Sequence, residues 1–229
     1  MNLLTSKEAI IFDLFDTLTD YESDWSDIPP VSVLLGISSK AWNDQLLLYS
    51  NDRLTGKLQD PFLIIKNMAH NIDNTIPDEV IHQVVINRTK RYSDALRNIP
   101  AENIETIRKL RLLNKKMALL SNADVMECSG WDKSPLRPFF DVVVFSCEAG
   151  FAKPDPAAYE FCMNKLGISA SDCVFVGDGG SNELAGARSL GITTVFVSDK
   201  MKVKQPEAVH VRIQQSDYHI DSIPELLNL

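Results

Sequence analysis

The chain has 229 residues, 45% of them hydrophobic, and is therefore long enough to bury a substantial core, as one domain with an insertion or as two modest domains. Its net charge of -8 and its pI near 5.0 argue against nucleic acid and anionic membranes as partners, although a local positive pocket could still hold a small anionic ligand. No segment reaches the ~18 uninterrupted apolar residues of a membrane helix and the first residues carry no secretory signal, so we expect a cytoplasmic protein. The four cysteines form no CxxC pair and the four histidines are scattered, which favours buried reduced thiols over a zinc site or a disulfide framework.

The first predicted element is a strand near the N-terminus. Residues 9–20 read AIIFDLFDTLTD, and apolar residues with high β propensity surround Asp13. This pattern predicts a buried parallel strand whose carboxyl end places the Asp13 carboxylate in a crevice. Ligands of open α/β sheets bind at such strand ends, so we expect Asp13 to act as a nucleophile or metal ligand. A simple helix-cap or turn role is the alternative.

The next part of the chain has a different periodicity. From about Ser39 to Arg97 apolar residues recur at helical spacing, with breaks near Gly56 and Pro77. We therefore expect a helical module over residues 18–97 and an α/β core formed by residues 1–17 and 98–229. No strand of the main sheet is expected from residues 39–96.

The α/β pattern resumes with a predicted helix over residues 101–116 and alternates from there. Short Val- and Phe-rich runs that end in small or polar residues predict parallel strands at 117–121, 141–146, 173–178 and 193–198. Helical segments at 155–167 and 181–191 lie between the later strands, and each closes on a glycine. This alternation predicts a doubly wound parallel sheet, in which right-handed crossovers bring all strand carboxyl ends to one edge.

Polar residues at these strand ends indicate phosphoryl transfer. Asp13, Asp178 and the pair Ser121 and Asn122 stand at the ends of three predicted strands, and Lys153 precedes a predicted helix. An aspartate can attack phosphorus to give an acyl phosphate, and a second acid from another strand can share a hard cation with it. Mg2+ with carboxylate and phosphate oxygens suits such a site. A serine hydroxyl and a lysine would offset the charge of the phosphoryl group.

With these motifs the sequence resembles the haloacid dehalogenase superfamily of hydrolases over nearly the whole chain. IIFDLFDTL, LLSN, GFAKPDP and VFVGDGGSNELAGA occur in the family's order. The resemblance implies a Rossmann-like core and makes residues 18–97 an inserted cap domain that closes over the site and selects substrates. It also implies residue roles: Asp13 as nucleophile, Ser121 and Asn122 as phosphoryl-binding residues, Lys153 as the bridge between nucleophile and phosphate, and Asp13, Asp178 and the Phe15 backbone carbonyl as Mg2+ ligands.

Two positions depart from the family pattern. Phe15 occupies the place of a second aspartate that serves the family's phosphatases as general acid and base, and Asp16 follows where a glycine is common. Loss of a general acid typically removes 10² to 10⁴ in rate, about 3 to 5 kcal/mol of barrier. In the fourth motif, Glu183 stands where aspartate is commoner. Glu183 is a further candidate metal ligand, directly or through water, or it simply begins a helix with Asn182.

Three functions therefore stay open, with a Mg2+-dependent phosphatase favoured over the other two. An aromatic residue two positions after the nucleophile also occurs in the family's 2-haloacid dehalogenases, which use no metal, but an intact VGDGG with a second buried acid argues against that chemistry. The third function is a phosphate- and metal-binding regulatory protein with little turnover. We expect a small phosphorylated or otherwise anionic substrate, which Arg53, Lys57 or Lys66 of the helical module could contact, and a monomer or homodimer.

Overall fold

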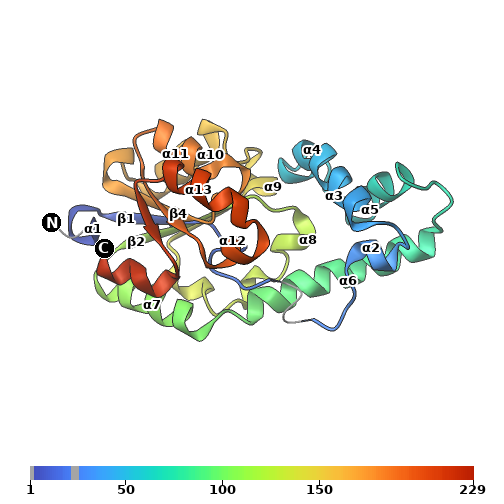
Figure 1. Cartoon of the computed structure of the whole chain (residues 1–229), viewed down its shortest axis with the longest axis horizontal. Coiled ribbons are helices and arrows are strands. Elements are labelled where there is room, and N and C mark those ends of the chain that lie inside the picture. Colours follow the sequence, from blue (N-terminus) through green and yellow to red (C-terminus); the bar gives the residue numbers. More distant parts are fainter. Residues whose placement is uncertain (1–2, 22–25) are drawn as a thin grey trace.

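The computed structural model describes residues 3–21 and 26–229, and within them the chain forms a six-stranded sheet in which all neighbouring strands are parallel (Figure 1). The strand order is β3-β2-β1-β4-β5-β6. The topological switch point lies at β1, because β2 and β3 are on one side of it and β4 to β6 are on the other. The predicted doubly wound α/β fold is therefore confirmed. The strands are β1 (Ala9–Phe12), β2 (Lys116–Ser121), β3 (Val142–Phe145), β4 (Cys173–Gly177), β5 (Thr193–Val197) and β6 (Tyr218–Ile220).

Helices cover both faces of the sheet (Figure 1). In the amino-terminal half of the chain they are α1 (Leu3–Ser6), α2 (Val31–Leu34), α3 (Ser39–Leu48), α4 (Ser50–Leu54), α5 (Pro61–His70), α6 (Asp78–Arg97) and α7 (Ala101–Leu112). In the remainder they are α8 (Val125–Cys128), α9 (Ser146–Ala149), α10 (Pro156–Leu166), α11 (Glu183–Ser189), α12 (Asp199–Lys204) and α13 (Pro206–Gln215). Short 3-10 helices lie at Trp131–Lys133, Arg137–Phe139, Ala170–Asp172, Gly180–Asn182 and Ile223–Asn228.

Strand β1 lies at the centre of the core because all four of its residues are fully buried. Its side chains alternate between the two faces of the sheet. Ile10 and Phe12 pack with residues of α7 and the C-terminal 3-10 helix, whereas Ala9 and Ile11 pack with residues of α10 and α11. A strand buried on both faces needs a continuous apolar run, which explains why β1 could be recognised in the sequence.

The edge strand β6 was not among the predicted strands. Its three residues pair with β5, but Tyr218 and His219 are exposed and only Ile220 is buried. An edge strand with one buried side chain has no apolar run and therefore gives almost no sequence signal. The other predicted strands form, and each ends within about two residues of the expected position, as boundaries commonly do.

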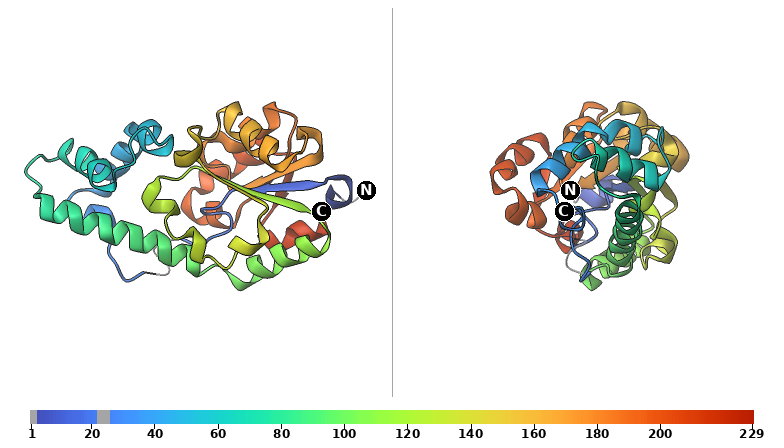
Figure 2. Two further views of the ribbon diagram at one scale, coloured as in Figure 1. Left: turned by 180° about the vertical axis from the view of Figure 1, so that it is seen from behind. Right: turned by 90° about the vertical axis from the view of Figure 1, so that its right-hand side faces the viewer.

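Residues 26–97 contribute helices and no strand to the sheet. Helices α2 to α6 enclose a separate apolar cluster that includes Trp42, Ile65, Met68 and Ile81. Figures 1 and 2 show this helical region beyond the end of the sheet to which the strands point, with α6 running from it back to the rest of the chain. The described residues 26–97 thus contain no strand of the main sheet, as expected. The division into two domains at residues 17 and 97 stays a prediction.

Two further expectations concern membranes and thiols. Among the described helices, none has both the length and the apolar character needed to cross a bilayer. All four cysteines are free thiols, and Cys147, Cys162 and Cys173 are buried. Cys128 is partly exposed, so the expectation of a buried thiol is wrong at this position. It is the last residue of the four-residue helix α8.

Candidate active site

Asp13 is the first residue after the central strand β1. Its backbone N–H still bonds to Val176 O of β4 at 2.9 Å, so the chain leaves the sheet just past this residue. The residue is 7% exposed. One carboxylate oxygen accepts a hydrogen bond from the Thr17 hydroxyl at 2.9 Å, and the other accepts one from the Lys153 ammonium. The carboxylate is therefore held in one orientation by two donors.

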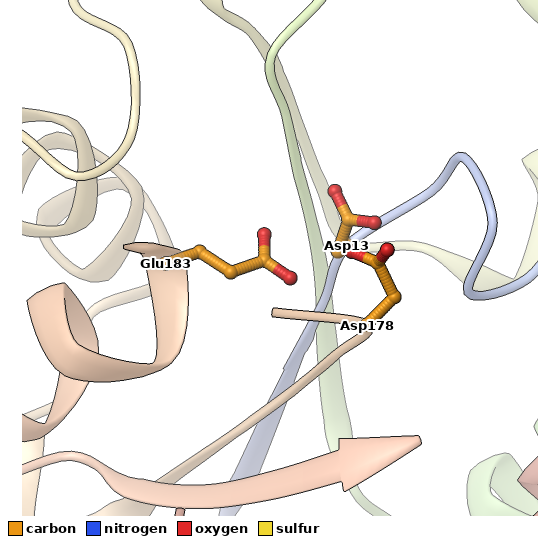
Figure 3. Close-up of side chains that lie close together, drawn as sticks. All are labelled: Asp13, Asp178 and Glu183. Carbon is orange, nitrogen blue, oxygen red and sulfur yellow. The ribbon is translucent and has the colours of Figure 1, made fainter. Parts of the chain in front are cut away.

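Two more acids meet Asp13 at this edge of the sheet. Asp178 follows β4, and Glu183 begins α11. Oxygen atoms of the three buried carboxylates lie within 4.8 Å of one another, and Figure 3 shows the side chains converging from three separate segments. The close approach depends on Gly177, because a Cβ there would lie 2.1 Å from Glu183 Oε1.

Lys153 is the cation at the centre of this cluster. The residue is 4% exposed, and its ammonium donates to Asp13 and, at 2.5 Å, to Glu183 Oε2. Asn122 holds the backbone of Lys153 through two hydrogen bonds of 2.7 Å, one from the Asn122 amide to Lys153 O and one from Lys153 N–H to Asn122 Oδ1. The sequence predicts phosphoryl binding for Asn122, and these contacts add a positioning role for its side chain.

Ser121 ends β2, the strand that pairs with β1, and is 1% exposed. Its hydroxyl oxygen has no hydrogen-bond partner within the described part of the chain. Buried hydroxyl groups in native proteins are nearly always paired, because an unpaired one costs about 1 to 3 kcal/mol. An unpaired hydroxyl at this edge of the sheet is the kind of donor that a bound phosphoryl oxygen would satisfy.

The electrostatics of the cluster show an excess of negative charge. Burial and the nearby Asp13 carboxylate raise the pKa of Asp178 to about 6. The same two causes raise the pKa of Glu183 well above its usual value. Burial alone would lower the pKa of Lys153, but the carboxylates of Asp13 and Glu183 outweigh it and raise that pKa. Lys153, together with Arg212 beside Asp178, thus supplies less positive charge than the three buried acids need.

A hard divalent cation fits these residues. The donors are oxygen atoms only, as Mg2+ prefers, and a carboxylate has about four acceptor positions, so the existing hydrogen bonds leave room for a metal on Asp13 and Asp178. Within the described residues, the Phe15 carbonyl oxygen accepts no hydrogen bond. Glu183 is more fully engaged, since Lys153 and the Gly179 N–H occupy one oxygen each.

The two departures from the family pattern have a structural context. The Phe15 ring lies edge-on to Tyr92 of α6, with ring centroids 5.3 Å apart and an interplanar angle of 83°. Asp16 has φ = 60°, a left-handed conformation that glycine adopts more easily. Its carboxylate forms an ion pair with Lys204 of α12 at 2.5 Å. The Asp16 carboxylate is therefore already paired with a lysine.

The sequence analysis missed two residues of this site. The Thr17 hydroxyl, besides donating to Asp13, accepts the Asp178 N–H at 3.0 Å and so links the two acidic loops. Arg212 of α13 donates to the Asp178 carbonyl oxygen at 2.6 Å, and its guanidinium lies 3.5 Å from Asp178 Oδ2. Thr17 could have been suspected as a hydroxyl four residues after the nucleophile. Nothing in the sequence connects Arg212 with a loop 34 residues away.

The helical region and the core together line a cavity of about 720 Å³ that includes Asn122 and Lys153. Arg53, Lys57 and Lys66 were the cations expected to contact an anionic substrate. Of these three, only Lys57 lines this cavity, and within the described residues it has no ion pair. Arg53 is 8% exposed and bonds Asp124 at 3.2 Å, whereas Lys66 pairs with Asp78 at 2.8 Å. Arg53 and Lys66 are therefore already neutralised, and Lys57 remains available to a ligand.

Relatives support a hydrolase with this arrangement. Over 129 residues the chain is 31% identical to the glyceraldehyde 3-phosphate phosphatase of Methanocaldococcus jannaschii, a match that covers 55% of this chain and 54% of that protein. It is 29% identical over 133 residues to the pyrophosphatase PpaX of Halalkalibacterium halodurans, covering 57% and 59%. The matches thus span little more than half the length of these relatives.

Solved structures share the fold across the whole chain. A dehalogenase crystal structure superposes with a TM-score of 0.71 at 21% identity, covering 97% of this chain and 96% of that one. The L-2-haloacid dehalogenase of Xanthobacter autotrophicus gives 0.65 at 17% identity, covering 97% and 98%. Residues 7–191 match the family model for haloacid dehalogenase-like hydrolases, so the chain belongs to the haloacid dehalogenase-like hydrolase family.

Proposed function

We propose that the protein is a Mg2+-dependent phosphatase-type hydrolase, which cleaves a small phosphate ester through an aspartyl phosphate on Asp13. The observation that supports this most is the Lys153 ammonium bound to the Asp13 carboxylate within a cluster of three acids, with the unpaired Ser121 hydroxyl at the end of the neighbouring strand β2. This set offers a nucleophile, a cation and a neutral donor to one phosphoryl group. The phosphatase names of the relatives agree with it.

In the proposed reaction, a carboxylate oxygen of Asp13 attacks phosphorus while the bond from phosphorus to the leaving oxygen breaks. Thr17 and Lys153 keep the nucleophile oriented, and Lys153 offsets the charge that builds up as the two anions meet. The Ser121 hydroxyl and nearby backbone N–H groups bind the non-bridging oxygens. Water then attacks phosphorus in the acyl phosphate and regenerates the Asp13 carboxylate.

The metal belongs to the same proposal. Asp13, Asp178 and the Phe15 carbonyl oxygen would hold Mg2+, with Glu183 a further ligand, directly or through water. When bound, Mg2+ would neutralise charge on the phosphoryl oxygens and on the two aspartates.

The substrate should be a small ester with a second anionic or polar group. We propose that residues 18–97 form the cap domain over a core of residues 1–17 and 98–229, and that the cavity between them takes the leaving group. Lys57 is the cap residue placed to meet an anion there. Because Phe15 cannot donate a proton, substrates whose leaving groups need little protonation, such as aryl and acyl phosphates, should be preferred over alkyl phosphates.

The test is a panel of phosphate esters assayed for phosphate release, with Mg2+ and with a chelator. We expect turnover that requires Mg2+ and that falls by at least about 10³-fold in Asp13→Asn. Asp132→Asn is the matched control, because the Asp132 side chain is 95% exposed and lies outside the site. Turnover that is unchanged in Asp13→Asn would overturn the proposal.

One observation, the aromatic ring of Phe15 next to the nucleophile, also suits a 2-haloacid dehalogenase. The two activities separate by product, since a dehalogenase would release halide from a 2-haloacid without Mg2+. A regulatory protein of the same fold would instead bind Mg2+ and phosphate and release neither product.

A further inference from the structure

Two thiols lie close together at a place that the proposed reaction does not use. Cys128 ends α8 and Cys147 lies in α9, and their sulfur atoms are 3.9 Å apart. Both line a cavity of about 470 Å³ together with Trp131 and Glu148. Cys128 is partly exposed and Cys147 is buried, so a small reagent could reach the pair through the cavity.

We propose that Cys128 and Cys147 form a dithiol site that a small peroxide oxidises to a disulfide. The two sulfur atoms need to approach by only about 1.9 Å from 3.9 Å, because an S–S bond is ~2.05 Å long. Either sulfur can donate the hydrogen bond between them; when Cys128 donates, it lowers the pKa of Cys147, which makes Cys147 the better nucleophile. The Cys128 thiol also lies 3.9 Å from Val125 O, so this donor can turn between two acceptors.

The chemistry balances with hydrogen peroxide as the only oxidant. The Cys147 thiolate attacks one peroxide oxygen, the O–O bond breaks, and hydroxide leaves and takes up a proton to become water. The resulting sulfenic acid is attacked at sulfur by Cys128, so the S–S bond forms, the S–O bond breaks and a second water leaves. The two sulfur atoms together lose two electrons, and these reduce the peroxide to two waters.

The site touches both the catalytic loop and the helical region. The hydroxyl of Ser146, next to Cys147, accepts from Ala123 N–H at 3.0 Å, directly after Asn122. On the other side, the Cys147 carbonyl oxygen accepts from the Gln59 side chain at 3.4 Å. A Cβ on Gly56 would lie 2.0 Å from the same oxygen, so the two segments fit without space to spare. Movement of α9 on disulfide formation should therefore disturb both.

The other two cysteines are internal controls. Cys162 and Cys173 are each 0% exposed, and burial is the main cause that raises the pKa of each to about 12. No hydrogen bond joins them within the described residues. Neither should react with peroxide while the protein is folded.

The experiment treats the folded full chain with hydrogen peroxide, blocks remaining thiols with an alkylating reagent and maps the linkages by mass spectrometry without reduction. We expect a Cys128–Cys147 linkage that dithiothreitol reverses, and full alkylation of Cys162 and Cys173 only after unfolding. In Cys128→Ser, with folding checked by circular dichroism, dimedone should trap a sulfenic acid on Cys147. Cys162→Ser should form the linkage as the unmodified protein does.

The proposal is overturned if Cys128 and Cys147 stay unlinked, or if they react no faster than the two buried thiols. A second readout is turnover, which should fall by at least about tenfold on oxidation and recover on reduction, as expected for a small displacement at a catalytic loop. That readout rests on the proposed function, whereas the linkage does not. A linkage without any change in turnover supports the dithiol site and separates it from the catalytic proposal.

Discussion

Replacing Phe15 by aspartate tests how this site manages proton transfer. The unmodified protein has a ring where the family's phosphatases carry a carboxylic acid, and Asp16, the next acid along the chain, is paired with Lys204. The Phe15→Asp side chain would start from the same Cα, two residues after the nucleophile. It would therefore place a proton donor on the leaving-group side of Asp13 without changing the carbonyl oxygen proposed for the metal.

The expected magnitudes follow from what the ring contacts. Loss of the edge-on pair with Tyr92 should cost about 0.5 to 1.5 kcal/mol of folding free energy, in addition to the apolar burial that this half-buried ring loses. A positioned general acid contributes ~10² to 10⁴ in rate, and a carboxylate without evolved support should reach the lower end. We therefore expect kcat/KM for alkyl phosphates to rise by about 10²-fold, or about 2.7 kcal/mol of barrier.

The assay compares an alkyl with an aryl phosphate in three proteins. Aryl phosphates should gain only about threefold or less, because their leaving groups need little protonation. Phe15→Asn is the matched control, since it removes the same ring and adds a side chain of the same shape that cannot act as an acid. The reasoning fails if Phe15→Asp and Phe15→Asn give the same alkyl-to-aryl ratio. It also fails if the unmodified protein already hydrolyses alkyl phosphates as fast as aryl phosphates.

Three further outcomes are expected. Arg88→Met should lower the free energy of unfolding by about 3 to 5 kcal/mol in urea titrations, because it removes one of the two arginines that pair with the buried carboxylates of Asp124 and Glu127. Lys90→Met on the same helix, with a 59% exposed side chain, should cost less than about 1 kcal/mol. Asp178→Asn should weaken Mg2+ binding by at least about tenfold in titration calorimetry, and equal affinity would remove Asp178 from the ligand set. Lys57→Met should raise KM about tenfold for a substrate with a second anionic group and leave a neutral aryl phosphate unchanged.

Much of the fold could be predicted because its centre is built from local patterns. A strand buried on both faces, such as β1, must be apolar throughout, and an acid directly after it is conspicuous for the same reason. Once parallel strands are recognised, their carboxyl ends must meet at one edge, so Asp13, Ser121 and Asp178 could be grouped without any knowledge of distances. The structure brings Asp13 and Asp178 together in this way, whereas phosphoryl binding by Ser121 stays a prediction.

The parts that could not be predicted depend on contacts between distant segments. Arg212 reaches Asp178 from a surface helix, and any Arg on an amphipathic helix would look the same in the sequence. Arg53 and Lys57 were equally plausible ligands for a substrate, and only the structure separates a buried, ion-paired side chain from one that lines the cavity. Asn122 was expected to bind phosphate, but its two hydrogen bonds to Lys153 depend on a loop 31 residues away.

The loop after β2 connects these contacts into one unit. Ser121 presents its unpaired hydroxyl, Asn122 holds the loop of Lys153, and Asp124, fully buried, accepts from Arg53 of α4 and Arg88 of α6 at 3.2 Å each. A buried carboxylate that lost both arginines would be left as an unpaired charge, which is strongly unfavourable. Movement of the helical region away from this loop therefore costs much free energy, unless the arginines stay with Asp124 or water replaces them. The position of the helical region and the shape of the loop after β2 are therefore coupled through one carboxylate, only three residues from the hydroxyl proposed to bind substrate.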